Sequence, residues 1–235
     1  RVRGKFDHNL ADGVPMPILD GAAVDDDEQV KMQPLQYLVD HFDDLKVSEP
    51  IKTPQKSTAV YINSPEGNSV RFELAAVHPD TALRVPFGIK SYQDEPTSRP
   101  DMHVEIKDPA MLALFERMDA KVVELAVKNC ATWFKHVHPD DIPMMYRPIL
   151  SSNPASSHPP FINCKIDLRA GCQVPFRCMK YDMSANSIAS IPVVTKETVP
   201  AGSAGFPLIS LGGIWFMSGR FGITLNISDF LLTNC

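Results

Sequence analysis

Basic and aromatic side chains are interleaved along several short stretches of this sequence, as in the segments 176–181 and 215–220. Aromatic rings stack on nucleobases, each stack contributing about 1–3 kcal/mol, and Lys and Arg side chains contact phosphates. The candidates are Trp215, Tyr181 and Tyr92 for stacking, and Arg177, Lys180, Arg220, Lys165 and Lys90 for phosphate contacts. This combination is typical of a surface that holds single-stranded nucleic acid.

Residues that could support catalysis or bind a metal ion are sparse. His136 and His138, with Asp140 and Asp141 after them, could bind a divalent cation. They lie at a predicted helix end before a proline, where histidine more often caps carbonyls and aspartate begins the next helix. The sequence offers no Ser/His/Asp arrangement, no paired carboxylates and no phosphate-binding glycine loop. We therefore expect a binding protein rather than an enzyme, with no catalytic residue, metal site or cofactor.

The strongest strand pattern lies in the segment 207–232. After Gly219 apolar and polar residues alternate strictly, which predicts a strand with one face in the core. The expected core residues are Ile214, Phe216, Phe221, Ile223, Leu225 and Ile227, and the expected outward residues are Trp215, Arg220, Thr224 and Asn226. Thr224 and Asn226 thus join the candidate binding residues.

A two-residue turn at Ser218-Gly219 would set the register of this hairpin and place Trp215 opposite Gly222. The indole then lies on the polar face beside Arg220, where it can stack on a flat ligand. A strand tryptophan is also often covered by a helix or loop of its own protein, which is the alternative for Trp215.

Further short strands are expected before and after one long amphipathic helix. Their segments are 58–62, 70–77, 83–92, 102–107, 161–168, 174–181 and 188–194, the first two forming a hairpin around the turn at 63–68. The long helix begins at Asp108-Pro109 and ends near His136, and a short helix follows at 140–147. Strands, a helical insertion at 108–148 and more strands predict a mainly β fold, an oligonucleotide-binding (OB-fold-like) barrel with one long and one short helix.

Charge and composition divide the chain into two parts. The net charge is −5, but the segment 141–235 carries 7 Lys and Arg against 5 Asp and Glu, a balance of +2. The segment 1–56 carries 7 Lys and Arg against 11 Asp and Glu. We expect it to be an acidic, largely irregular N-terminal arm that wraps on the domain or binds a partner. Residues 57–235 would form the barrel domain, with any polyanion on its basic C-terminal third.

The cysteine pattern indicates reduced thiols in an intracellular protein. Five cysteines, with no CxxC pair, give neither a disulfide framework nor the paired spacing of a zinc site.

No stretch approaches the roughly 20 apolar residues of a membrane helix, so we expect no membrane association.

Several motifs resemble a family of proteins from large eukaryotic DNA viruses and their relatives. They are VPFGI at 85–89, the helix DAKVVELAVKNCATWF, MYRPIL at 145–150, PPFINCKI and GGIWFMSGRFGITLNISDFLL, in that order. That family is thought to bind single-stranded DNA through an oligonucleotide-binding barrel, and it is distantly similar to the single-stranded-DNA-binding proteins of podophages. The resemblance covers roughly residues 58–232 and implies a role in DNA replication, recombination or repair, in the nucleus or a viral replication compartment of the host cell.

Two hypotheses of different class follow. The first is sequence-tolerant binding and protection of single-stranded DNA, with RNA as a further ligand and replication or recombination proteins and a second copy of the chain as further partners. The second is a structural or assembly protein that uses the β-barrel as a docking surface. The second predicts apolar rather than basic side chains on the outward face of the strands.

Overall fold

The computed structural model describes residues 33–53, 58–74, 81–90, 99–152, 158–168, 175–182 and 187–234. Its strands are β1 (Gln33–Pro34), β2 (Lys46–Val47), β3 (Ile51–Lys52), β4 (Thr58–Asn63), β5 (Arg71–Glu73), β6 (Leu83–Val85), β7 (Ile89–Lys90), β8 (Asp101–Glu105), β9 (Leu150–Ser151), β10 (Phe161–Lys165), β11 (Arg177–Asp182), β12 (Ser187–Ser190), β13 (Ser203–Met217) and β14 (Arg220–Asn234). Its helices are α1 (Leu35–Asp40), α2 (Pro109–Lys128), α3 (Cys130–Trp133) and α4 (Ile142–Met145), with 3-10 turns η1 (Phe42–Asp44), η3 (Pro139–Asp141) and η4 (Lys196–Thr198). The fold is mainly β with a helical insertion between β8 and β9, as predicted.

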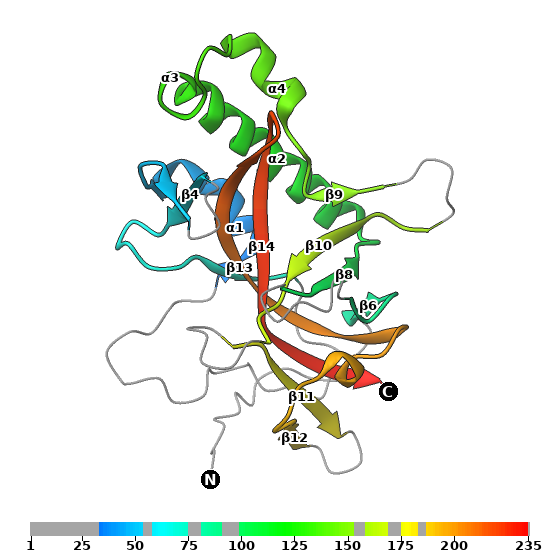
Figure 1. Ribbon diagram of the computed structural model, residues 1–235. Helices are drawn as coiled ribbons and strands as arrows, with labels where there is room; N and C mark the ends of the chain where they lie inside the picture. Colours follow the sequence, from blue (N-terminus) through cyan, green and yellow to red (C-terminus); the bar gives the residue numbers. More distant parts are fainter. Residues whose placement is uncertain are drawn as a thin grey trace.

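The β13–β14 hairpin is the centre of the sheet and runs through the length of the molecule (Figure 1). The main strand order is β1-β5-β13-β14-β10-β8-β7, and β4 and β6 also pair with β13. Among the described residues no ladder joins the two ends of this order, β1 and β7, so a closed barrel is not confirmed. Helices α2, α3 and α4 gather around the turn end of the hairpin (Figure 1).

One face of the hairpin and of β10 builds the hydrophobic core. Phe221, Ile223, Leu225 and Ile227 of β14 are buried, as the alternation predicted. They share one cluster with the buried stripe of α2, which includes Phe115 and is spaced at three and four residues. The predicted start of α2 is also confirmed, since the Asp108 side chain accepts a hydrogen bond from the backbone N–H of Ala110 and Pro109 is the first helical residue.

Strands β4 and β5 do not form the hairpin that the turn at 63–68 predicted. Within the described residues a single isolated bridge, between Asn63 and Ser69, joins the two segments. Each strand pairs with β13 instead, β4 near Trp215 and β5 near Ile209. The turn residues favour a reversal of the chain, but the long β13 offers both strands a fuller ladder than they offer each other.

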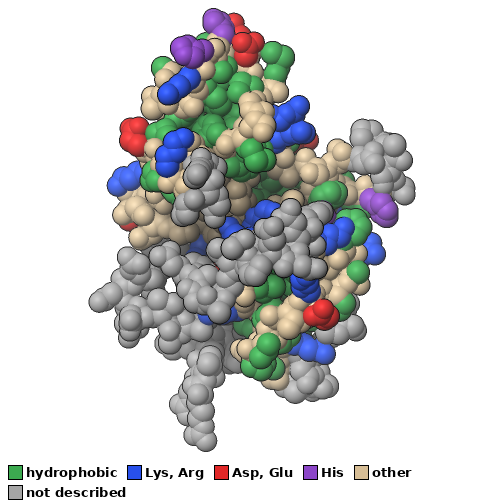
Figure 2. Space-filling view, in the orientation of Figure 1, with side chains coloured by type: hydrophobic (Ala, Val, Ile, Leu, Met, Phe, Trp, Pro, Cys, Tyr) green, Lys and Arg blue, Asp and Glu red, His purple; other side chains and the backbone are tan. Residues whose placement is uncertain are grey.

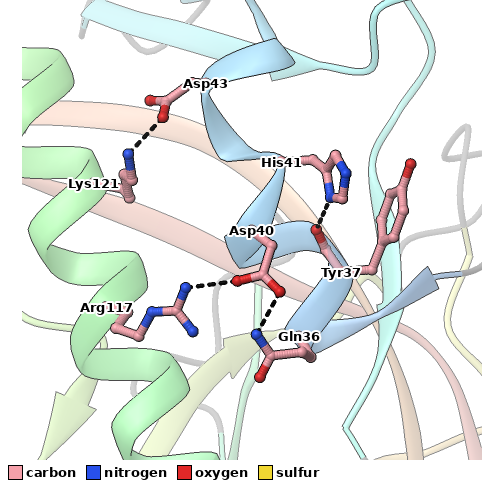
Figure 3. Close-up of polar contacts among 7 residues, drawn as sticks. All are labelled: Gln36, Tyr37, Asp40, His41, Asp43, Arg117 and Lys121. Carbon is pink, nitrogen blue, oxygen red and sulfur yellow. Dashed lines mark hydrogen bonds and ion pairs between the residues drawn. The ribbon is translucent and has the colours of Figure 1, made fainter.

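The described part of the predicted N-terminal arm, residues 33–53, packs into the same core as the rest of the chain. Leu35, Leu38 and Val39 of α1 are buried in the main hydrophobic cluster. On the exposed side, Arg117 of α2 donates to Asp40 at 2.6 Å and Lys121 contacts Asp43, as Figure 3 shows. The buried side chains of α1 therefore belong to the main hydrophobic core, while the acidic run at 25–28 lies outside the described residues.

No helix in the described part of the chain is long and apolar enough to cross a membrane.

Candidate nucleic-acid interface

The turn of the β13–β14 hairpin has the predicted two-residue geometry. Ser218 and Gly219 both have positive φ, 52° and 72°, the left-handed conformation that a type I′ hairpin turn requires. The strands pair as expected, with Phe216 opposite Phe221 and Trp215 opposite Gly222. The register predicted from the sequence is confirmed.

The indole of Trp215 lies against the backbone of Gly222. A Cβ atom built on Gly222 would come 2.8 Å from Cζ2 of Trp215 and 3.1 Å from the carbonyl oxygen of Arg147. Only glycine therefore leaves room for the ring at this position. Trp215 is half-buried, so one side of the indole rests on the strand while part of the ring is accessible.

Two glycines on β13 change the strand alternation just before Trp215. Leu211 pairs with Leu225 and Ile214 pairs with Ile223, so Gly212 and Gly213 together oppose one residue of β14, which makes a β-bulge. The bulge lets Leu211 and Ile214, three residues apart, both face the core. It also leaves Trp215 on the opposite face, which we call the polar face.

The polar face continues across the sheet, because residues paired on neighbouring strands point to the same side. Asn226 of β14 is paired with Lys165 of β10, Lys165 with Asp101 of β8, and Asp101 with Lys90 of β7. On its other side, Asn226 is paired with Ser210, which is paired with Arg71. The side-chain oxygen Oδ1 of Asn226 also accepts a hydrogen bond from Arg99 at 2.7 Å.

Buried carboxylates lie beneath exposed cations on this face. Lys165 pairs with Asp101, Arg84 and Lys107 both pair with Glu105, and at the far end of the hairpin Arg177 pairs with Asp229. The four cationic side chains are 39–64% exposed, whereas the three carboxylates are 2–4% exposed. The surface thus presents the cations, even though the whole chain carries a net charge of −5. Figure 2 shows Lys and Arg side chains spread over the visible face, with few Asp or Glu beside them.

An aromatic cluster adjoins these cations. His103 of β8 stacks on Phe161 of β10, with ring centroids 4.6 Å apart and an interplanar angle of 14°. The edge of Phe87 contacts both rings, and Nζ of Lys90 lies 3.8 Å from the centroid of Phe87. Such a cation–π contact fixes the ammonium group beside the rings.

The segment between α4 and β9 supports the turn end of this face. Tyr146 packs on Phe221 and donates a hydrogen bond of 2.6 Å to Asp119 of α2. Burial raises the pKa of the Asp119 carboxyl, an effect that the hydrogen bonds from Tyr146 and the backbone of Ile149 oppose. The next residue, Arg147, is exposed, and its backbone carbonyl lies near Gly222.

The far end of the hairpin is covered. Tyr181 of β11 is 7% exposed and packs with Phe206 and Leu231 in a second hydrophobic cluster. It therefore presents little ring surface for stacking, in contrast to the role expected for it. Lys180 is exposed but lies on the other side of β11 from Arg177 and Tyr181, because side chains alternate along a strand.

The structure thus brings most of the expected residues to one surface and separates two of them. The residues on the polar face are Trp215, Arg220, Thr224, Asn226, Lys165, Lys90 and Arg177. Tyr181 lies on the same side of β11 as Arg177 but is covered by the second hydrophobic cluster, Lys180 lies on the other side of β11, and Tyr92 lies outside the described residues.

Several residues of this surface were missed in the sequence. Phe161 was not among the candidate binding residues, but it is half-buried on the polar face, on the same side of β10 as Lys165. The signal was present, since Ile162, Cys164 and Ile166 form the core side of that segment and Phe161 has the opposite parity. The alternation in β8 likewise indicates that Asp101, His103 and Glu105 share a face.

The histidines and aspartates at 136–141 and the cysteines were the other residues considered for metal binding. His138 lies 3.3 Å from Asp140 on an exposed turn, and no group of three or more His, Cys, Asp or Glu side chains among the described residues is placed to hold a metal ion. Cys130, Cys164 and Cys178 are buried free thiols, and the other two cysteines lie outside the described residues.

No protein-family model matches the sequence, and no match to a curated protein was found. The resemblance to a family from large eukaryotic DNA viruses is therefore not confirmed. The solved structures that are similar in part include three of the single-stranded DNA-binding protein from bacteriophage Enc34. The structure in complex with single-stranded DNA has 13% identity and a TM-score of 0.40, over 78% of this chain and 93% of that one.

The other two structures are of the same phage protein. The C-terminal truncation has 9% identity and a TM-score of 0.41, over 83% of this chain and 97% of that one. The third has 10% identity and a TM-score of 0.40, over 80% and 89%. Scores of this size describe a weak likeness, which establishes neither a common fold nor a common ligand.

Proposed function

We propose that this protein binds single-stranded DNA on its polar face, with little dependence on sequence, and protects it during replication, recombination or repair. The observation that carries the proposal is the layer of exposed cations over buried carboxylates, next to Trp215 on Gly222. Cations that follow a strand face suit a phosphate backbone, and an accessible indole suits a base.

The mechanism needs no reaction. Lys165, Lys90 and Arg220 would contact phosphates, and Trp215 would stack on one base of the strand. An extended single strand allows both contacts at once because its bases are unpaired, whereas a duplex hides the base faces in its stack. We therefore expect single strands to bind more tightly than duplexes.

The side chains exposed on the polar face favour this function over a docking surface for another protein. A docking surface was expected to expose apolar side chains on the outward face of the strands. The exposed or half-exposed side chains there are mostly cationic or polar, with Lys165, Arg71 and Asn226 in the central row. Each carboxylate fixes its cation while leaving other N–H donors of that cation available to a ligand.

Fluorescence titration tests the proposal directly. The chain has two tryptophans, so Trp133→Phe leaves Trp215 as the only indole reporter. We expect single-stranded DNA to quench this emission, duplex DNA to bind less tightly, and added salt to weaken binding steeply through counterion release. RNA of the same sequence measures the preference for DNA. Absence of quenching and of any gel shift with single-stranded DNA would overturn the proposal.

A further inference from the structure

The feature that the proposed function leaves unexplained is the imidazole of His103. His103 is 8% exposed, both of its ring nitrogens are buried, and neither nitrogen has a hydrogen-bond partner among the described residues. Leaving a buried polar group without a partner costs about 1–3 kcal/mol, and proteins seldom retain such a group without a reason. A ligand that supplies the missing hydrogen bond is one such reason.

The surroundings of His103 fit a flat aromatic ligand. Phe161 stacks on one face of the imidazole, and the edge of Phe87 closes one side, 5.5 Å from the imidazole centroid. Phe87 is 40% exposed and Phe161 is half-buried, so the cluster reaches the surface of the polar face. Aromatic surface of this kind binds another flat ring by stacking or by edge contact.

The charges around His103 fit the phosphate of the same ligand. Lys90 and Lys165 lie on the two strands that flank β8, and Asp101, the carboxylate between them, is buried under Lys165. Burial and the two lysines hold the pKa of His103 below its usual range, while Asp101 acts in the opposite direction. A neutral imidazole has one N–H donor and one acceptor nitrogen, which can match the edge of a base.

We propose that one nucleobase of the bound strand docks against the aromatic cluster of Phe87, His103 and Phe161, and that its binding uncovers the buried edge of His103, which then hydrogen-bonds to the edge of this base. The inference rests on the proposed function and adds a second base site, on the opposite side of β14 from Trp215. Lys90 and Lys165 hold the adjoining phosphates. The protein should therefore show a modest base preference at this one position, within otherwise sequence-tolerant binding.

The first test compares wild type and His103→Phe on oligo-dT, oligo-dC and oligo-dA of equal length. Phenylalanine keeps the stack on Phe161 but removes both ring nitrogens. We expect the variant to lose about threefold to tenfold in affinity for the preferred homopolymer, and less for the others, because one hydrogen bond is lost. Its thermal midpoint should stay equal or rise, since an unpartnered polar group leaves the interior. The inference would be overturned if His103→Phe kept the wild-type order and ratio of affinities for the three homopolymers, or if it lost affinity equally for all three.

The second test separates this site from binding of the whole strand. Nucleoside monophosphates are titrated into the wild-type chain, and the ring nitrogens of His103 are followed by 15N NMR, with the signal assigned by its absence in His103→Phe. We expect the His103 signals to shift while those of the exposed His138 do not. Strand binding without a shift of His103 overturns the base site alone, whereas absence of strand binding in the homopolymer series overturns the proposed function itself.

Discussion

The two ends of the β13–β14 hairpin differ although they are built from the same alternating strands. At the turn end, the polar face is open and Trp215 lies on Gly222 with part of its indole accessible. At the far end, the corresponding side is covered by the cluster of Tyr181, Phe206 and Leu231. An aromatic residue on a strand can therefore serve a ligand or the core, and the neighbouring elements decide which.

The difference has a simple physical origin. Near the turn, Trp215 has β4 on one side and β14 on the other, and α2, α3 and α4 gather around this end of the hairpin. At the far end, β11 adds to β14 and carries Met179 and Tyr181 onto Leu231, while β12 extends the layer with Ile188. Apolar side chains on three strands bury each other there, and burial is favourable in proportion to the apolar area removed from water.

The largest expected effect is on stability at the covered end. Tyr181→Ala should lower the free energy of unfolding by about 3 kcal/mol or more, because it leaves a cavity between Phe206 and Leu231. Single-strand affinity of the folded protein should stay unchanged. Urea denaturation and a DNA titration give the two values, and Tyr181→Phe, which keeps the ring, is the control. A large loss of affinity with unchanged stability would instead assign Tyr181 to the binding surface.

The open end should respond in the opposite way. Trp215→Ala should weaken single-strand binding by about 1–3 kcal/mol, the contribution of one stacked base, with a smaller effect on stability. Trp133→Phe is the matched control, since Trp133 packs edge-on against Phe216, 5.9 Å away, rather than on the polar face. Equal affinities of wild type and Trp215→Ala in gel-shift titrations would remove Trp215 from the interface.

Gly222→Ala tests the support of Trp215 without touching the indole. The added methyl group would meet the ring at 2.8 Å and the Arg147 carbonyl at 3.1 Å, so the indole must move. We expect a shift in Trp215 emission in the Trp133→Phe background and a loss of affinity similar to that of Trp215→Ala. If Gly222→Ala left both the Trp215 emission and the affinity for single-stranded DNA unchanged, this role of the glycine would be contradicted.

A double-mutant cycle separates the charge of Lys165 from its structural role. Lys165→Gln alone leaves Asp101 buried without its partner, which should cost about 1–3 kcal/mol of stability. Adding Asp101→Asn should restore stability but not binding. In the double variant the slope of log affinity against log salt should become shallower by the amount that corresponds to about one lost phosphate contact. A double variant with wild-type salt dependence would show that Lys165 does not contact the strand.

The smallest expected effect is a pH dependence of stability from His103. The pKa of His103 is lowered in the folded protein, mainly by burial, so below the ordinary histidine pKa of about 6.5 the unfolded chain binds more protons than the folded one. Stability should therefore fall as the pH decreases below this value and be unaffected above it. Urea midpoints across this range should change less in His103→Phe than in wild type. Parallel curves for the two proteins would contradict the burial of a neutral imidazole.

The sequence by itself determined the local geometry of the site. Strict alternation in β14 and the Ser218-Gly219 turn were enough to predict the hairpin register, the core face and the position of Trp215 over Gly222, because side-chain direction in a strand and turn type depend on neighbouring residues. The helix start at Asp108-Pro109 is local in the same sense.

Only the tertiary structure decided which parts of each face stay accessible. It buried Tyr181, stacked Phe161 on His103, and placed Lys165, Arg84 and Arg177 over carboxylates from other strands. Each of these outcomes depends on elements distant in the sequence, such as β8 beside β10, whose pairing no local pattern specifies. Local alternation assigns a residue to one side of a strand, but burial and charge depend on what the rest of the chain places against that side.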